Sequence, residues 1–289
     1  MKRYRFFFFD YDCRANLLQP IPEHWHNKEQ HIKNQKQTLS NLIWEYGEQE
    51  INVKKQNLLD IGIVPLSAIF FHNRFLRQIR NSYITGCYYP ALTGACALGE
   101  RILNHLLDKL KSHYKTTEEY KTIHRKKSID DWEKAIRILQ KWGVFNDKVK
   151  DEFLKLKEKR NNAIHFNPEV DSKYKNLALE AISIIQKIIS LQFSPFEEQP
   201  WWFWLSGECY IKQEYESVPF IKEILIPNCQ LVGPNHLVES LYPLEINDPS
   251  YENKEITDEQ FKALRETWRS NPTVDNQLTP LKTNSSTKK

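Results

Sequence analysis

The chain of 289 residues contains little glycine, and its eight glycines never form a GxxxxGK or GxGxxG pattern. Such loops cradle phosphates in nucleoside triphosphatases and dinucleotide-binding enzymes, so the sequence indicates neither class. Long hydrophobic runs are also missing. The longest, Ile61–Phe71, is interrupted by Pro65 and is too short to span a membrane. Four phenylalanines follow the basic start, but Asp10 and Asp12 end that run too early for a signal peptide.

Cysteine is scarce as well. The five cysteines are odd in number and widely scattered, so they do not describe a disulfide framework. With no membrane-spanning run, this composition predicts a soluble, cytoplasmic protein with reduced thiols and no membrane partner.

Potential metal ligands fall into two loose groups: His24, His26 and His31, and Cys209, Cys229 and His236. Strong metal sites use closely spaced pairs such as CxxC, which neither group contains. We therefore predict no metal ion and no other cofactor.

Charge is distributed unevenly along the chain. Residues 1–192 hold 32 basic and 22 acidic side chains, a net charge of +10, whereas residues 193–259 hold 3 and 13, a net charge of −10. Such asymmetry suggests modules with different electrostatic roles. Opposite net charges attract, so we expect the acidic segment to dock on the basic one and to restrain its binding of anions.

Apolar residues recur at helical spacing through most of the first two thirds of the chain. Helices are expected over residues 31–59, 65–83, 91–113, 128–142, 146–166 and 174–191. Pro65 opens the second of them at a first-turn position that proline tolerates. The sequence thus predicts a mostly α protein, with four or five packed helices between residues 63 and 195.

Beyond Pro195 the pattern changes to short segments rich in aromatic and β-branched residues, separated by glycine, proline and asparagine. The segments WWFWL, ECYIKQEY, PFIKEILIP and CQLVG are expected to be strands. One capped helix follows at Thr257–Ser270, and the polar tail from Asn271 onward is expected to be disordered. We therefore divide the chain into an N-terminal helical extension (1–62), a bundle (63–195), a small acidic α+β module (196–270) and a tail (271–289).

The segment KRNNAIHFNP, residues 159–168, concentrates polar side chains at the expected end of a helix. If the helix persists to residue 166, Asn161 and His165 lie four residues apart on one face, and Arg160 can reach the same patch. The helix C-terminus favours a charged histidine while Arg160 opposes it, which suits acid–base chemistry near neutral pH. A guanidinium fork also fits phosphate. A purely structural role, with Arg160 in an ion pair and His165 as a cap, is the alternative.

The pattern Arg-Asn-x-x-x-His at the end of a helix, with two long helices before it and one after it, resembles the HEPN (higher eukaryotes and prokaryotes nucleotide-binding) family. The resemblance covers roughly residues 63–195 and includes the helix ALTGACALGERILNHLL. Arg160 and His165 match the family's invariant pair, and Asn161 matches the polar residue that often follows the arginine.

The resemblance implies a four- or five-helix bundle that forms a homodimer with both motifs at the interface. Many members of the family are metal-independent endoribonucleases of toxin–antitoxin, abortive-infection or other defence systems, whereas others only bind nucleotides or partners. We expect the dimer to use residues 91–113 and 174–191, and an antitoxin or regulatory protein to be a further partner.

Glu100 lies on the apolar stripe of its helix, where an unpaired carboxylate is costly. It orients Arg160 or His165 from the facing helix, forms a structural ion pair with Arg101 or another arginine, or is simply exposed at the edge of the stripe. A basic stretch from Lys109 to Lys127 either tracks phosphates or is a solvated connection. The leading interpretation is RNA cleavage, with His165 as acid and base, Arg160 stabilising charge at phosphorus, and Asn161 and Glu100 completing the site. The alternative is a non-catalytic adaptor that binds a nucleotide or a protein.

Overall fold

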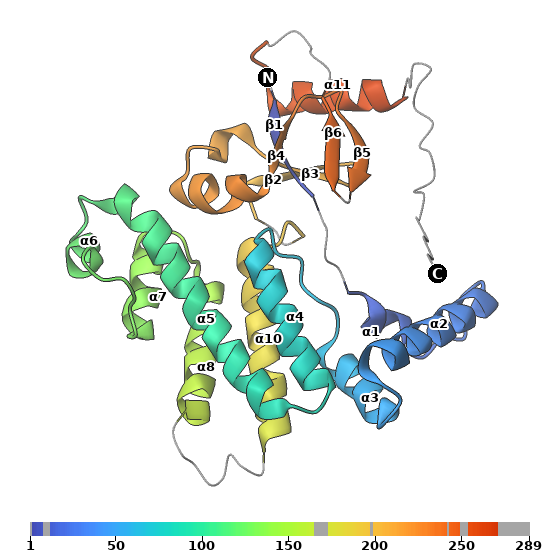
Figure 1. Ribbon diagram of the computed structural model, residues 1–289. Helices are drawn as coiled ribbons and strands as arrows, with labels where there is room; N and C mark the ends of the chain where they lie inside the picture. Colours follow the sequence, from blue (N-terminus) through green and yellow to red (C-terminus); the bar gives the residue numbers. More distant parts are fainter. Residues whose placement is uncertain are drawn as a thin grey trace, which may run out of the picture.

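The computed structural model describes residues 2–7, 12–164, 173–196, 199–241, 243–248 and 254–270. It is mostly helical, with a small region of antiparallel sheet built largely from the C-terminal part of the chain (Figure 1). This confirms the predicted mostly α class and the change of pattern after Pro195. The tail (271–289), which we expected to be disordered, lies outside the described residues.

Three helices precede the bundle: α1 (Arg14–Leu17), α2 (Lys28–Tyr46) and α3 (Ile51–Ile61). The expected helix over residues 31–59 is therefore two helices, separated at Gly47, whose φ of +78° favours glycine. Helix α2 extends away from the bundle (Figure 1) and buries only Thr38 and Leu42 fully. Its weak amphipathic pattern is explained by this small contact.

The bundle is built around α5 (Tyr88–Leu110) and α10 (Tyr174–Phe193), which pack against each other and against α4 (Phe70–Ile84) and α8 (Asp147–Ile164). Helix α7 (Trp132–Lys141) covers α5 and α8 on the other side. In the sequence, the short η1 (Lys111–Tyr114) and α6 (Glu118–Ile123) connect α5 to α7. Asp131 caps α7 by accepting a hydrogen bond from the Lys134 N–H at 3.0 Å.

The predicted helix start at Pro65 is wrong, because α4 begins only at Phe70. The side chain of Ser67 explains the delay. Its hydroxyl accepts a hydrogen bond from the Ile69 N–H at 3.1 Å, and its carbonyl accepts one from the Asn73 side chain. These local bonds offer the backbone an alternative to the helix.

The C-terminal module contains two antiparallel sheets and several helical turns. Its elements are β2 (Trp202–Leu205), β3 (Glu208–Ile211), η2 (Gln213–Tyr215), η3 (Ile221–Leu225), η4 (Ile226–Asn228), β4 (Gln230–Val232), β5 (Leu237–Leu241), β6 (Leu244–Asn247) and α11 (Asp258–Ser270). The segment PFIKEILIP was predicted to be a strand and forms helical turns instead. The hairpin of β5 and β6 was not predicted.

The four-stranded sheet takes one of its inner strands from the other end of the chain. Strand β1 (Arg3–Phe6) lies between β3 and β4, in the order β2-β3-β1-β4, with Arg3 opposite Val232 and Arg5 opposite Tyr210. The expected boundary at residue 62 did not anticipate this pairing, which makes the first residues part of the C-terminal module.

Both faces of this sheet are covered, in keeping with the alternation of side chains along a strand. Trp202, Cys209 and Ile211 join the hydrophobic core of the bundle. The opposite face holds Phe203 and Tyr210, which pack with Phe261 of α11 in a second core.

The module docks on the bundle mainly through apolar contacts. Phe220 of the module lies 6.0 Å from Phe193 of α10, measured between ring centres, and His113 pairs with Glu223 at the edge. This contact is at the C-terminal end of α5. At the rise of an α-helix, it lies about 20 Å along the helix axis from Glu100. Apolar side chains of the module therefore join the core of the bundle here, and the expected restraint of anion binding by the acidic segment stays a prediction.

Candidate functional site

The candidate site lies where α5 and α8 cross, and Gly99 permits that crossing. A Cβ atom at residue 99 would lie 2.5 Å from Cδ2 of Leu156 and 3.0 Å from the indole ring of Trp132. A side chain at this position would force Leu156 or Trp132 out of its packed place between the helices. The close approach brings Glu100, the next residue on α5, within reach of Arg160 on α8.

Glu100 contacts side chains from two neighbouring helices through one carboxylate oxygen. Its Oε2 accepts a hydrogen bond from Trp132 Nε1 at 3.2 Å and lies 3.5 Å from Nη2 of Arg160. The guanidinium carbon of Arg160 is 5.9 Å from the centre of the Trp132 ring, a distance at which a cation is attracted to the aromatic face. The sequence named Glu100 as a residue that could orient Arg160, and the structure brings the two together.

Arg160 uses only part of its hydrogen-bonding capacity. Its Nε atom is buried and has no hydrogen-bond partner in the described part of the chain. Its contact with Glu100 is long for a charged pair, and the side chains remain 27% and 35% exposed. Buried N–H groups are normally paired. An anionic ligand that reached Nε would satisfy this donor.

A hollow of about 500 Å³ opens beside this pair. Its walls are formed by Thr93, Cys96, Ala97, Glu100, Arg101 and Asn104 of α5, by Arg160 and Ala163 of α8, and by Ser128 from the loop before α7. The hollow thus combines small side chains with two arginines and one carboxylate. This composition suits a ligand with both flat apolar faces and polar edges.

The loop that carries Ser128 is fixed to α5 by Asn104. The side-chain oxygen of Asn104 accepts a hydrogen bond from the Ile129 N–H at 2.7 Å, and its amide nitrogen donates to the Ile129 carbonyl at 3.3 Å. These two hydrogen bonds therefore fix the position of the loop that forms this side of the hollow.

Cys96 lines the hollow, but its thiol is a poor nucleophile. Burial raises the pKa of its thiol to about 12, although the positive charge of Arg160 acts in the opposite direction. The thiolate is the reactive form of cysteine, so this thiol stays protonated at neutral pH.

The other residues of the predicted site lie at or beyond the described end of α8. Asn161 follows Arg160 and is partly buried. His165 lies outside the described residues, directly after Ile164. The expected convergence of Arg160, Asn161 and His165 on one face therefore stays a prediction.

Sequence reasoning missed two residues that shape the site, Gly99 and Trp132. Neither carries a sequence signal for this role, since one is an isolated glycine and the other the first residue of α7. Their importance depends on which helices pack together.

The basic stretch divides into two parts. Lys111 and Lys121 form ion pairs with Asp108 and Glu118, three residues away in each case, as expected of a solvated surface. In contrast, Arg125, Lys126 and Lys127 are exposed and form no ion pair with other described residues; Ser128 of the hollow follows them directly. Three exposed cationic side chains therefore come directly before a residue that lines the hollow.

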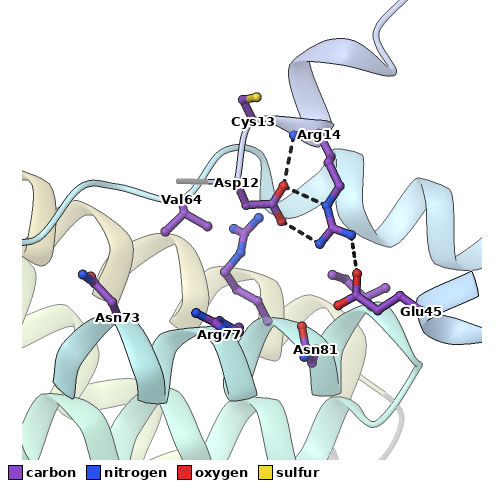
Figure 2. A pocket seen from close by; sticks show the side chains of 10 residues that line it. Asp12, Cys13, Arg14, Glu45, Val64, Asn73, Arg77 and Asn81 are labelled. Atoms are coloured by element: carbon purple, nitrogen blue, oxygen red, sulfur yellow. Dashed lines mark hydrogen bonds and ion pairs between the residues drawn. The ribbon is translucent and has the colours of Figure 1, made fainter. Parts of the chain in front are cut away.

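A second hollow, of about 340 Å³, lies between the N-terminal segment and α4 (Figure 2). Arg14 holds its two carboxylates, contacting Asp12 through Nε at 2.9 Å and Nη2 at 2.8 Å, and Glu45 through Nη1. Arg80 donates to carbonyl oxygens at the end of α3. Arg14 thus fastens the N-terminal segment to α2, and Arg80 fastens the end of α3 to the bundle. Sequence reasoning missed these contacts between elements because their partners are far apart in the chain.

Searches for related proteins find no match among family models, curated proteins or solved structures. Membership of the HEPN family therefore stays a prediction. Among the described residues, no cluster of histidine, cysteine, aspartate or glutamate side chains has the arrangement of a metal site. Within the same residues, no helix has both the length and the hydrophobicity to cross a lipid bilayer.

Proposed function

We propose that the protein is a metal-independent endoribonuclease of the HEPN type. The observation that supports this most is the state of Arg160, which stands at the wall of a hollow with a buried and unpaired Nε atom. The guanidinium group is five residues before His165, the spacing of the family's catalytic pair. Arg160 would bind the phosphate to be cleaved and stabilise the charge that develops on it.

In this proposal the ribose 2′-hydroxyl is the nucleophile. His165 removes its proton, the 2′-oxygen attacks phosphorus, and the bond to the 5′-oxygen of the next nucleotide breaks. The leaving oxygen takes up a proton from an acid, and we assign this role to His165 as well, which returns the proton it took from the 2′-hydroxyl. The products are a 2′,3′-cyclic phosphate and a 5′-hydroxyl, and no metal-bound water takes part. Asn161 would position the substrate or His165.

Glu100 has a positioning role in this scheme. Its contact with Nη2 and the ring of Trp132 hold the guanidinium from one side, and the exposed part of the same side chain would bind the phosphate. Arg125, Lys126 and Lys127 would attract the RNA backbone toward the hollow. A homodimer, and a toxin or defence context with an antitoxin or regulatory partner, belong to the same proposal.

The decisive experiment incubates the purified full-length protein with total RNA in EDTA. We expect cleavage that leaves 2′,3′-cyclic phosphate ends and is lost in Arg160→Ala and His165→Ala. Arg137→Ala, which removes an exposed arginine of α7, is the matched control and should cleave normally.

A wild-type protein that cleaves no RNA under any of these conditions contradicts the enzyme proposal. The partly unpaired Arg160 then favours the alternative, an adaptor that binds a nucleotide or a protein partner without cleaving RNA. In that case Arg160→Ala should lose binding, and no cyclic phosphate should form.

A further inference from the structure

We infer that the hollow beside Glu100 is a subsite for a guanine base, with Glu100 binding its Watson–Crick edge. The inference rests on the proposed function, since it identifies the base that lies next to the phosphate held by Arg160. It concerns selectivity, which the catalytic pair alone does not determine.

Glu100 has capacity for a ligand. Both of its contacts go to Oε2, at the long distances of 3.2 and 3.5 Å, whereas Oε1 has no hydrogen-bond partner among the described residues. Trp132 nevertheless fixes the orientation of the carboxylate at the wall of the hollow. A positioned acceptor with unused lone pairs is suited to receiving N–H donors from a bound molecule.

Of the four RNA bases, guanine complements a carboxylate best. A carboxylate only accepts hydrogen bonds, and guanine presents two adjacent donors, N1–H and N2–H, on its Watson–Crick edge. Adenine, cytosine and uracil each place an acceptor beside their donor, and that acceptor would face the negative charge. Discrimination therefore comes from repulsion of the wrong bases as well as from attraction of the right one.

The shape of the hollow fits a flat ring. Its walls include the small side chains of Cys96, Ala97 and Ala163, and its volume of about 500 Å³ leaves room for one nucleoside. The guanidinium group of Arg101 lies 4.7 Å from the centre of the Phe75 ring, which supports it at the edge of the hollow. Single-stranded bases commonly stack on such guanidinium planes.

The test measures calorimetric binding of the four 3′-mononucleotides to the full-length protein. We expect guanosine 3′-monophosphate to bind about 10- to 100-fold more tightly than the other three, the range expected for one specific pair of hydrogen bonds to a base. Glu100→Gln should abolish this preference, because its amide group would place a donor against a guanine donor. Glu158→Gln, an exposed carboxylate of α8, is the matched control and should retain it.

A second variant tests the position of the base independently of charge. Ala97→Leu adds volume inside the hollow at a solvent-exposed residue of α5, so the fold should tolerate it. It should weaken binding of guanosine 3′-monophosphate at least 10-fold. Unchanged binding would place the base elsewhere and overturn the inference.

The results separate this inference from the proposed function. Equal affinity for all four nucleotides, or no binding of any, overturns the guanine subsite. If RNA is nonetheless cleaved, with no preference for guanine next to the cut and with the same products in Glu100→Gln, the endoribonuclease stands and the subsite does not. Selective binding of the guanine nucleotide without cleavage supports the subsite and contradicts the enzyme.

Discussion

Gly99 of α5 lies so close to Leu156 of α8 that a Cβ atom on the glycine would meet the leucine side chain at 2.5 Å. Leu156 is fully buried, and Trp132 occupies the space beside it. Both side chains are buried, so neither can move without displacing its neighbours. The distance between the two helices, and with it the contact between Glu100 and Arg160, therefore depends on the missing side chain of residue 99.

We expect Gly99→Ala to lower the free energy of unfolding by about 1–2 kcal/mol. Overpacking a core typically costs about 1–3 kcal/mol, and replacing a helical glycine with alanine offsets up to about 1 kcal/mol of this. Gly94→Ala is the control on the same helix, where the added atom meets only the Ile79 side chain, at 3.0 Å, and the loss should be smaller. Urea denaturation measures both, and equal stability of the two variants would contradict this view of the crossing.

Arg160→Lys should lower the rate of RNA cleavage by roughly 10²–10³-fold, nearly as much as Arg160→Ala. A lysine ammonium keeps the charge but lacks the planar fork that fits phosphate, and it cannot reproduce the Nε donor. Single-turnover cleavage rates measure the effect, with Arg137→Lys as the control. If Arg160→Lys cleaves at the rate of the wild type, charge alone is sufficient and the fork has no role.

The buried histidine of α4 should make the protein sensitive to acid. His72 is fully buried between Phe71 and Phe193, and burial, followed by the charge of His105, holds the pKa of His72 well below its usual value. The unfolded chain then binds a proton below about pH 6.5 that the folded chain does not bind, so stability falls as pH falls through that value.

The slope should approach about 1.4 kcal/mol per pH unit from this one group. Urea denaturation at pH 8, 6.5 and 5.5 measures it. His72→Asn keeps a polar group near Ser67 Oγ, which lies 3.3 Å from Nδ1 of the histidine, and should flatten the dependence between pH 6.5 and 5.5. An unchanged slope in this variant would assign the acid sensitivity to other groups.

A buried ion pair in the module should show strong coupling. Arg265 donates to both oxygens of Glu208 at 2.9 and 2.7 Å, and Arg5 of β1 lies 3.0 Å away. Burial alone would raise the pKa of Glu208, but the hydrogen bonds from Arg265 and the charge of Arg5 outweigh it and lower the pKa to about 2. The folded protein therefore depends on these partners to keep a carboxylate buried.

Arg265→Met should cost about 3–5 kcal/mol, because it leaves Glu208 with one buried partner fewer. In the background of Glu208→Gln the same substitution should cost clearly less. The four denaturation free energies of this double-mutant cycle give the coupling. Equal costs in both backgrounds would show that Arg265 stabilises the module through packing alone.

The helices of the bundle were predictable because their apolar stripes bury one face against a neighbour. The periodic residues of α5 and α10 fixed both helices to within a few residues of their bounds. The sequence was less informative where the same residues fit two different local structures. Pro65 is acceptable in a first helical turn, but Ser67 binds the backbone first, and the segment PFIKEILIP is β-branched yet coils into turns that bury Ile221 and Ile224.

Long-range relationships were less accessible to the sequence. Glu100 was singled out because a carboxylate interrupts an apolar stripe, and that argument led to the helix it faces. Trp132 and Gly99 do not interrupt a pattern in this way, so the sequence did not indicate their role. Likewise, the four residues of β1 contain no turn or repeat that connects them to strands near the other end of the chain, so their place in the sheet depends on tertiary packing alone.

The place of β1 also has a consequence for how the protein is made. Arg3 pairs with Val232, so the ribosome adds roughly 220 residues between synthesis of the strand and synthesis of its neighbour β4. Strand β1 has no partner until its other neighbour, β3, is made, and its second edge stays open until β4 follows; β4 pairs with no other strand of that sheet. Contacts this distant in sequence form late. A nascent chain interrupted before Val232 would therefore carry an open strand that can associate with other chains, and quality control should recognise such fragments readily.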